Sequence, residues 1–145
     1  MTKLPGDSSE QQEAERWLLD CLSRHLGVTL TKRRFFLDGG GWIELDGFCE
    51  SPLVLCEAWA HIGPPKSAQK NKVMADAFKL LFVNALVKGA GKRILLFADR
   101  EAAAHFQGKS WMAHCLNEHD IIVEIIELPL QLKTKILKAQ KRQYR

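Results

Sequence analysis

In the first part of the chain, apolar residues recur with the spacing of one helix face. The residues that follow have the composition of β-strands. The helical run starts at Ser8 or Ser9, has acids in its first turn, and ends at Gly27. Its apolar positions are Ala14, Trp17, Leu18, Cys21, Leu22 and Leu26. We expect an amphipathic helix here, and a second one from about residue 68 to 87, where apolar positions again share one side.

Between the two helices the sequence is rich in β-branched and aromatic residues. The runs at residues 28–37, 42–49 and 53–62 are separated by an Asp-Gly-Gly-Gly cluster and by Glu-Ser-Pro, both of which are turn signals. Together they predict a three-stranded antiparallel meander over residues 28–62.

The second half of the chain alternates between strand and helix patterns. Residues 93–99 form a nearly continuous apolar run, which is typical of a central strand covered on both faces. Residues 100–119 are helical in composition with a break at Gly108, and residues 121–129 predict the last strand. The predicted fold is one α/β domain over residues 1–145, in the order helix, three strands, helix, strand, helix, strand, basic helix.

The composition is that of an ordinary globular protein, with 46% hydrophobic and 26% charged residues among 145. No apolar run approaches the ~20 residues that span a bilayer, and the N-terminus lacks the order of a signal peptide. We therefore expect no membrane association and a cytoplasmic location. The four cysteines lie among apolar neighbours without a C-x-x-C pair, so we expect them to be reduced and buried.

The charge is distributed unevenly. The formal net charge is +4, but residues 1–60 hold 6 Lys or Arg against 10 Asp or Glu, whereas residues 61–145 hold 15 against 7. The last 13 residues carry six positive charges and no acid. Such a segment can contact nucleic-acid phosphates, and it can equally be the solvated face of a helix.

Two acids fall within the predicted meander. Asp46 and Glu57 belong to neighbouring antiparallel strands, where their side chains can come within reach of one ion. A buried carboxylate without a partner is costly, and Mg²⁺ takes hard oxygen ligands while keeping waters or phosphates in its other positions. The alternative is that Asp46, which precedes Gly47, is a turn residue and that Glu57 is half exposed on an edge strand.

The element order together with this pair of acids resembles the PD-(D/E)XK nuclease superfamily, whose core is the same αβββαβ arrangement. The resemblance covers nearly the whole chain and implies a restriction-endonuclease-like αβββαβαβ core. The helix sequence AERWLLDCLSRHLG is also similar to the first helix of archaeal Holliday-junction resolvases in that superfamily. By that match Glu15 is a third acid of the site, whereas the helical periodicity alone leaves Glu10 open as well.

The resemblance implies Mg²⁺-dependent or Mn²⁺-dependent hydrolysis of DNA phosphodiester bonds. Asp46, Glu57 and the carbonyl group of Ala58 would hold the metal, and Glu15 would act through water or the metal. In the superfamily a lysine follows the second acid by two residues, but Trp59 occupies that place here. The sequence therefore lacks the strand lysine that helps to position the attacking water.

A lysine from the next helix could replace the missing one. Relative to Val73, Lys70 lies about 60° away, near the inward face, whereas Lys72 lies about 100° to the other side. Lys70 is the better substitute, and Gln69 also points inward, where it could hydrogen-bond water or phosphate. Lys66 and Lys72 would contact the DNA backbone. The alternative for all of them is that they have no role at the site, because Lys and Gln are common in the first turn of a helix.

His61 and Trp59 share a strand face with Glu57 because side chains alternate along a strand. His61 could act on a proton or a phosphate, and Trp59 could stack on a base. The alternatives are that His61 is a structural histidine at the strand end with its hydrogen bonds satisfied, and that Trp59 packs in the core.

Two functions of different classes follow. The first is a small Mg²⁺-dependent endonuclease that binds DNA through phosphate contacts. The second is a nuclease-like fold without catalysis that binds nucleic acid or another protein, which the tryptophan at position 59 favours. The sequence leaves the nucleic-acid substrate open, and also the oligomeric state, for which a homodimer remains an option.

Overall fold

A computed structural model describes residues 8–143 of the chain. Its elements are α1 (Ser9–Leu26), β1 (Thr31–Phe36), β2 (Trp42–Cys49), β3 (Val54–Trp59), α2 (Ser67–Leu86), β4 (Lys92–Phe97), α3 (Arg100–Ala104), α4 (Trp111–Glu118), β5 (Ile121–Ile125) and α5 (Leu130–Gln143). The predicted order of elements is confirmed, with Gly108 in the break between α3 and α4. The last strand is shorter than predicted, because the chain leaves the sheet after Ile125.

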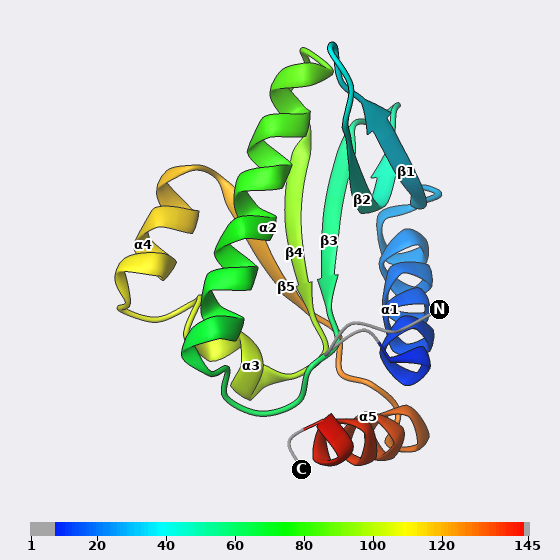
Figure 1. Cartoon of the computed structure of the whole chain (residues 1–145), viewed down its shortest axis with the longest axis vertical. Coiled ribbons are helices and arrows are strands. Elements are labelled where there is room, and N and C mark those ends of the chain that lie inside the picture. Colours follow the sequence, from blue (N-terminus) through cyan, green and yellow to red (C-terminus); the bar gives the residue numbers. More distant parts are fainter. Residues whose placement is uncertain (1–7, 144–145) are drawn as a thin grey trace.

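The five strands form one open, mixed sheet in the order β1-β2-β3-β4-β5 (Figure 1). Strands β1, β2 and β3 make the predicted antiparallel meander, while β3, β4 and β5 run parallel. The parallel half is covered by helices on both faces, as such sheets require. The predicted α/β class therefore matches the structure.

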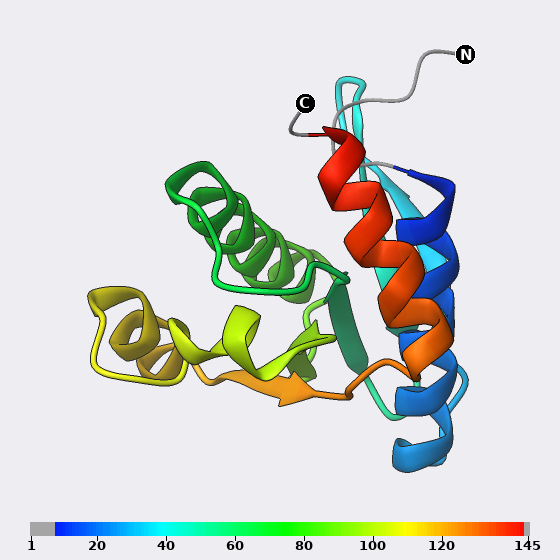
Figure 2. The same ribbon diagram turned by 90° about the horizontal axis from the view of Figure 1, so that it is seen from below.

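Helices lie on both faces of the sheet (Figure 2). One hydrophobic core joins α1 and α5 to the sheet, and the other joins α2, α3 and α4 to its opposite face. Alternate residues of β3 divide between the two cores: Cys56 faces α1, whereas Leu55 and Trp59 face α2. Glu57, between Leu55 and Trp59 in this alternation, is placed on the α2 face.

The start of α1 forms as its sequence predicts. The Ser8 hydroxyl accepts from the backbone N–H of Gln11, and the Gln11 side chain returns a bond to the backbone of Ser8. Gly27 ends the helix with φ at 68°, a conformation that glycine adopts without strain.

The cysteines are only partly as expected. All four are free, but Cys56 alone is buried, and Cys21, Cys49 and Cys115 are half-buried. The reason is position: Cys56 lies on the central strand β3, whereas Cys49 ends β2, and Cys21 and Cys115 lie on α1 and α4, helices that bury only one side. Within residues 8–143, no helix combines the length and the apolar character that crossing a membrane requires.

Candidate active site

The two predicted acids lie where β2 and β3 separate. The pairing of these strands runs from Cys49 and Val54 to Gly47 and Cys56 and stops there. Asp46 and Glu57 occupy the next position of that register. Beyond it, β2 continues against β1 and β3 continues against β4. The acids therefore stand opposite one another at a fork in the sheet.

Asp46 belongs to the middle of β2, so the alternative that it is a turn residue is wrong. The glycine after it is needed for close packing: a Cβ on Gly47 would lie 2.9 Å from the Leu19 side chain of α1. Where the strand pairing stops, the backbone N–H of Ala58 donates to Oδ2 of Asp46 at 2.9 Å. Asp46 thus accepts a hydrogen bond from the backbone N–H of Ala58, at the point where β2 and β3 stop pairing.

Glu57 is buried on the α2 side of this fork. Its side chain is 3% exposed, and Lys79 of α2 forms an ion pair with its Oε1 atom. The alternative that Glu57 is half exposed is therefore wrong as well. A carboxylate oxygen has two lone pairs, so this buried atom can accept a further partner beside Lys79.

The electrostatics of Glu57 reflect an excess of acids. Burial, together with hydrogen bonding to Asp46 and the charge of Asp46, raises the pKa of Glu57 to about 10. Burial alone would lower the pKa of Lys79, but the charge of Glu57, its hydrogen bond and the charges of Asp76 and Asp46 together outweigh burial, so the pKa of Lys79 is raised. Because Glu57 favours the protonated form and Lys79 the charged form, the site retains protons at neutral pH.

A third acid belongs to this cluster and was missed in the sequence. Burial raises the pKa of Asp76 to about 6, against the lowering effect of Lys79 and Lys72, while the charge of Asp46 adds to the rise. The signal was the spacing of Lys72, Asp76 and Lys79, at i, i+4 and i+7 along one flank of α2. The polar flank of this helix faces the fork.

The residues at the fork are of the type that binds a magnesium ion. Asp46 and Glu57 supply carboxylate oxygens, and Mg²⁺ commonly takes one or two carboxylates and keeps several waters. Within residues 8–143, no group of three or more His, Cys, Asp or Glu side chains is arranged to hold a metal ion. Any ion here would therefore depend on water or phosphate for its remaining ligands.

Glu15 approaches the same fork from the other face of the sheet. A cleft of about 390 Å³ between α1 and the start of the sheet is lined by Glu15 and Asp46, with Arg16 and Lys32 beside them. Glu10, the alternative third acid, is paired instead with Arg142 of α5 at 2.8 Å. The structure thus brings Glu15, not Glu10, to the cleft that Asp46 lines.

The lysine at the fork differs from the predicted one. The positive charge of Lys70 acts on His105, whose pKa is lowered by burial and by this charge, so Lys70 lies toward the end of α3. Gln69 accepts from the backbone N–H of Lys66 at 2.8 Å and so caps α2. The ammonium that meets Glu57 comes instead from Lys79, about two and a half turns further along the helix.

Trp59, in the place of the strand lysine, is packed in the core on the α2 side. Its ring stacks on His61 with centroids 4.4 Å apart, and Lys72 lies 5.5 Å from its centroid. Burial and the charge of Lys72 lower the pKa of His61 to about 4, so the ring is neutral at pH 7. The Gln11 amide, 3.0 Å away, then donates to His61 Nε2.

Two basic surfaces flank the fork. Helix α5 lies against α1, and the side chain of Gln140 forms hydrogen bonds with both backbone groups of Ile62, just after β3. Two of its basic residues pair with acids of α1, Lys135 with Glu13 and Arg142 with Glu10. Its remaining exposed lysines are Lys133, Lys138 and Lys141. The last two residues of the basic segment lie outside the described residues.

The hairpin of β1 and β2 is basic and aromatic. Phe36 and Trp42 are opposite one another in its register and are 78% and 53% exposed. The guanidinium of Arg34 lies 3.8 Å from the ring centroid of Trp42 and also pairs with Glu44. Lys32, on the same strand, reaches the cleft that Asp46 lines. A cationic and aromatic surface therefore leads to the fork.

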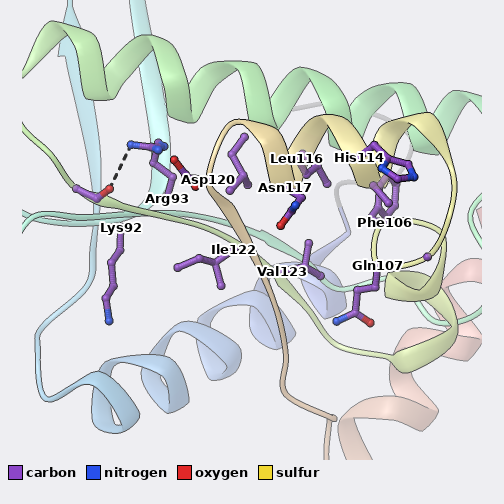
Figure 3. Close-up of a pocket in the computed structure, with 14 residues that line it drawn as sticks. Lys92, Arg93, Phe106, Gln107, His114, Leu116, Asn117, Asp120, Ile122 and Val123 are labelled. Carbon is purple, nitrogen blue, oxygen red and sulfur yellow. Dashed lines mark hydrogen bonds between the residues drawn. The ribbon is translucent and has the colours of Figure 1, made fainter.

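A wider groove of about 800 Å³ lies between β4, β5 and α4, away from the acids (Figure 3). Among its charged side chains, Arg93 donates to the carbonyl oxygens of Gly91 at 3.3 Å and His119 at 3.1 Å. Arg93 thereby ties the turn before β5 to the start of β4. None of the acids at the fork lines this groove.

Comparison with protein-family models, with curated proteins and with solved structures gave no match. The resemblance to the PD-(D/E)XK superfamily therefore stays a prediction from the sequence. Fold alone does not imply function, so the chemistry of the fork is the basis for assigning one.

Proposed function

We propose that this protein is a metal-dependent nuclease that hydrolyses phosphodiester bonds of DNA. The observation that carries the proposal is the ion pair between Lys79 and the buried Glu57, opposite Asp46 at the fork of β2 and β3. Two carboxylates and one ammonium group are the residue types that this chemistry uses. Lys79 would take the role that the sequence suggested for Lys70.

Each side chain has a distinct task in this proposal. Asp46 and Glu57 would hold Mg²⁺ or Mn²⁺, and when bound the ion would supply an activated water and offset the negative charge of the scissile phosphate. Lys79 adds a fixed positive charge beside Glu57. Trp59 and His61, stacked and buried, form an apolar wall that excludes water behind the acids.

DNA would be held by phosphate contacts from both basic surfaces. Contacts from the exposed lysines of α5 and the basic residues of β1 to phosphates would make binding largely independent of sequence and sensitive to salt. The exposed pair of Phe36 and Trp42 offers a surface on which unpaired bases could stack. This pair favours substrates with a single-stranded part.

A second function has a specific observation in its favour. The Asp46 carboxylate already accepts from Ala58, and Lys79 already contacts Glu57. These bonds would also suit a site that serves only the stability of a nucleic-acid-binding module. Such a module would bind DNA without cutting it.

A cleavage assay separates the two functions. Labelled single-stranded, duplex, flapped and four-way junction DNA would be incubated with the protein in Mg²⁺, Mn²⁺ or EDTA. We expect metal-dependent cleavage that is lost in Asp46→Asn, Glu57→Gln and Lys79→Met and retained in Lys109→Met, whose lysine is exposed between α3 and α4. Binding without cleavage in wild type would favour the module, and cleavage that persists in Asp46→Asn would contradict the assigned site.

A further inference from the structure

The outer side of α2 is apolar along its whole middle. Between Lys72 and Lys88 no exposed residue of this helix is charged or polar. The exposed positions are Ala75, Phe78, Phe82, Ala85 and Leu86. Phe78 is 73% exposed, and Phe82 and Leu86 are each 42% exposed. In Figure 2 this side of α2 is turned away from the sheet.

Such a face is unusual for a surface helix. A helix that covers a sheet buries one stripe and normally presents charged and polar residues on the opposite side, whereas a helix that is apolar all round is buried. Here α2 already buries Val73, Ala77, Leu80 and Val83 against the sheet. A contiguous outer apolar stripe, with its polar residues confined to one flank, marks an interaction surface.

The sequence of the stripe indicates what would cover it. The segment KVMADAFKLLFVNALVK, residues 72–88, is partly palindromic about its centre at Leu80: four of its eight symmetry-related pairs are identical, and two more are apolar in both positions. Phe78 corresponds to Phe82, Ala75 to Ala85, and Met74 to Leu86. Lys72 and Lys88 stand at the two ends.

A two-fold axis through the centre of this segment would bring the symmetry-related positions of two copies of α2 opposite each other. In an isologous contact the same patch of both subunits meets, so antiparallel copies of α2 centred on Leu80 bring equivalent positions together. Phe78 would then pack against Phe82 of the partner subunit. Ala75 would face Ala85 of the partner subunit, and these small residues allow the two backbones to approach closely. No exposed charge lies between them.

We propose that the outer face of α2 is the contact of a homodimer, with the two copies of the helix antiparallel about a two-fold axis at Leu80. Asp76 and Lys79 lie on the flank of α2 that faces the fork, so this contact leaves the acids accessible. The dimer rests on the geometry of α2 and does not depend on the proposed nuclease function.

Sedimentation equilibrium of the full chain tests the contact. We expect a dimer for wild type and a halved mass for Phe78→Glu and for Phe82→Glu, with unchanged circular dichroism. Trp111→Glu and Leu130→Glu are matched controls, because these side chains are 68% and 78% exposed on other helices. Both controls should remain dimeric. A monomeric wild type at 100 μM, or a dimer that survives Phe78→Glu, would overturn the proposal.

Cross-linking tests the antiparallel arrangement. In a background with the three half-buried cysteines changed to serine, Ala75→Cys and Ala85→Cys proteins are mixed and treated with a short bis-maleimide. Positions 75 and 85 should face each other across the axis, whereas the two copies of position 75 lie roughly 15 Å apart along the helix. We expect cross-links in the mixture and little in Ala75→Cys alone. The reverse result would refute the axis at Leu80.

Discussion

The ammonium group of Lys79 on α2 meets the carboxylate of Glu57 on β3, opposite Asp46 at the fork of the sheet. The cation thus comes from a helix, and Trp59, two residues after Glu57, is free to pack in the core with His61. A long, flexible lysine can reach the same point from a neighbouring element because a point charge has little orientational demand. The missing strand lysine is therefore no obstacle to a charged site.

For the proposed nuclease, Lys79→Met should abolish most of the activity, whereas Lys70→Met should leave most of it. Removing one charge that stabilises a developing negative charge lowers rates by roughly 100-fold. Lys79→Arg should recover part of the activity, because the positive charge is retained. Single-turnover cleavage rates with saturating Mg²⁺ measure the effect. Equal losses in Lys70→Met and Lys79→Met would show that the ion pair with Glu57 does not identify the catalytic lysine.

The fold was largely predictable because its elements are signalled locally. The α1 cap, the meander and the apolar run of β4 each depend on neighbouring residues, and their order limits the topology. The lysine was not predictable in the same way. Helical phase placed Lys70 near the inward face, but which flank of α2 meets the fork depends on how the helix crosses the sheet, and Lys79 lies nine residues further on, on the opposite flank from Lys70. Asp76 was missed for the same reason.

The burial of Glu57 should make stability fall as the pH rises. Its pKa is about 10 in the folded protein and 4.5 as the ordinary value, so the folded state binds more protons between these limits. The stabilisation is complete below pH 4.5 and is lost as the pH rises toward 10, by at most about 1.4 kcal/mol per pH unit. Urea unfolding between pH 6.5 and 9 measures the decline.

Glu57→Gln is the matched control for this decline, since it resembles the protonated carboxyl group and does not titrate. Its free energy of unfolding should change less over the same pH range than that of wild type. Parallel curves for the two proteins would mean that Glu57 is ionised in the folded state throughout, with Lys79 as its stable partner.

His61 should destabilise the protein in acid. Its pKa is about 4 in the folded state against an ordinary 6.5, because burial and the charge of Lys72 disfavour the imidazolium. The unfolded state binds more protons in this interval, so stability present above pH 6.5 is lost as the pH falls toward 4, by roughly 2 kcal/mol between pH 6.5 and 4.5. His61→Asn should lose less over that range, and an NMR titration midpoint near 6.5 would contradict the burial of the ring beside Gln11.

Metal binding at the fork should release a proton. At pH 7.5 the carboxyl group of Glu57 favours its protonated form because of burial and of Asp46, and a divalent cation requires ionised oxygen ligands. Titration calorimetry with Mn²⁺ in buffers of different ionisation enthalpy counts the protons released. We expect about one per ion for wild type, none for Glu57→Gln, and no binding for Asp46→Ala. Binding without proton release in wild type would place the metal away from Glu57. If wild type binds no Mn²⁺ at millimolar concentration, the carboxylates serve only as partners of Lys79, and the binding module is favoured over the nuclease.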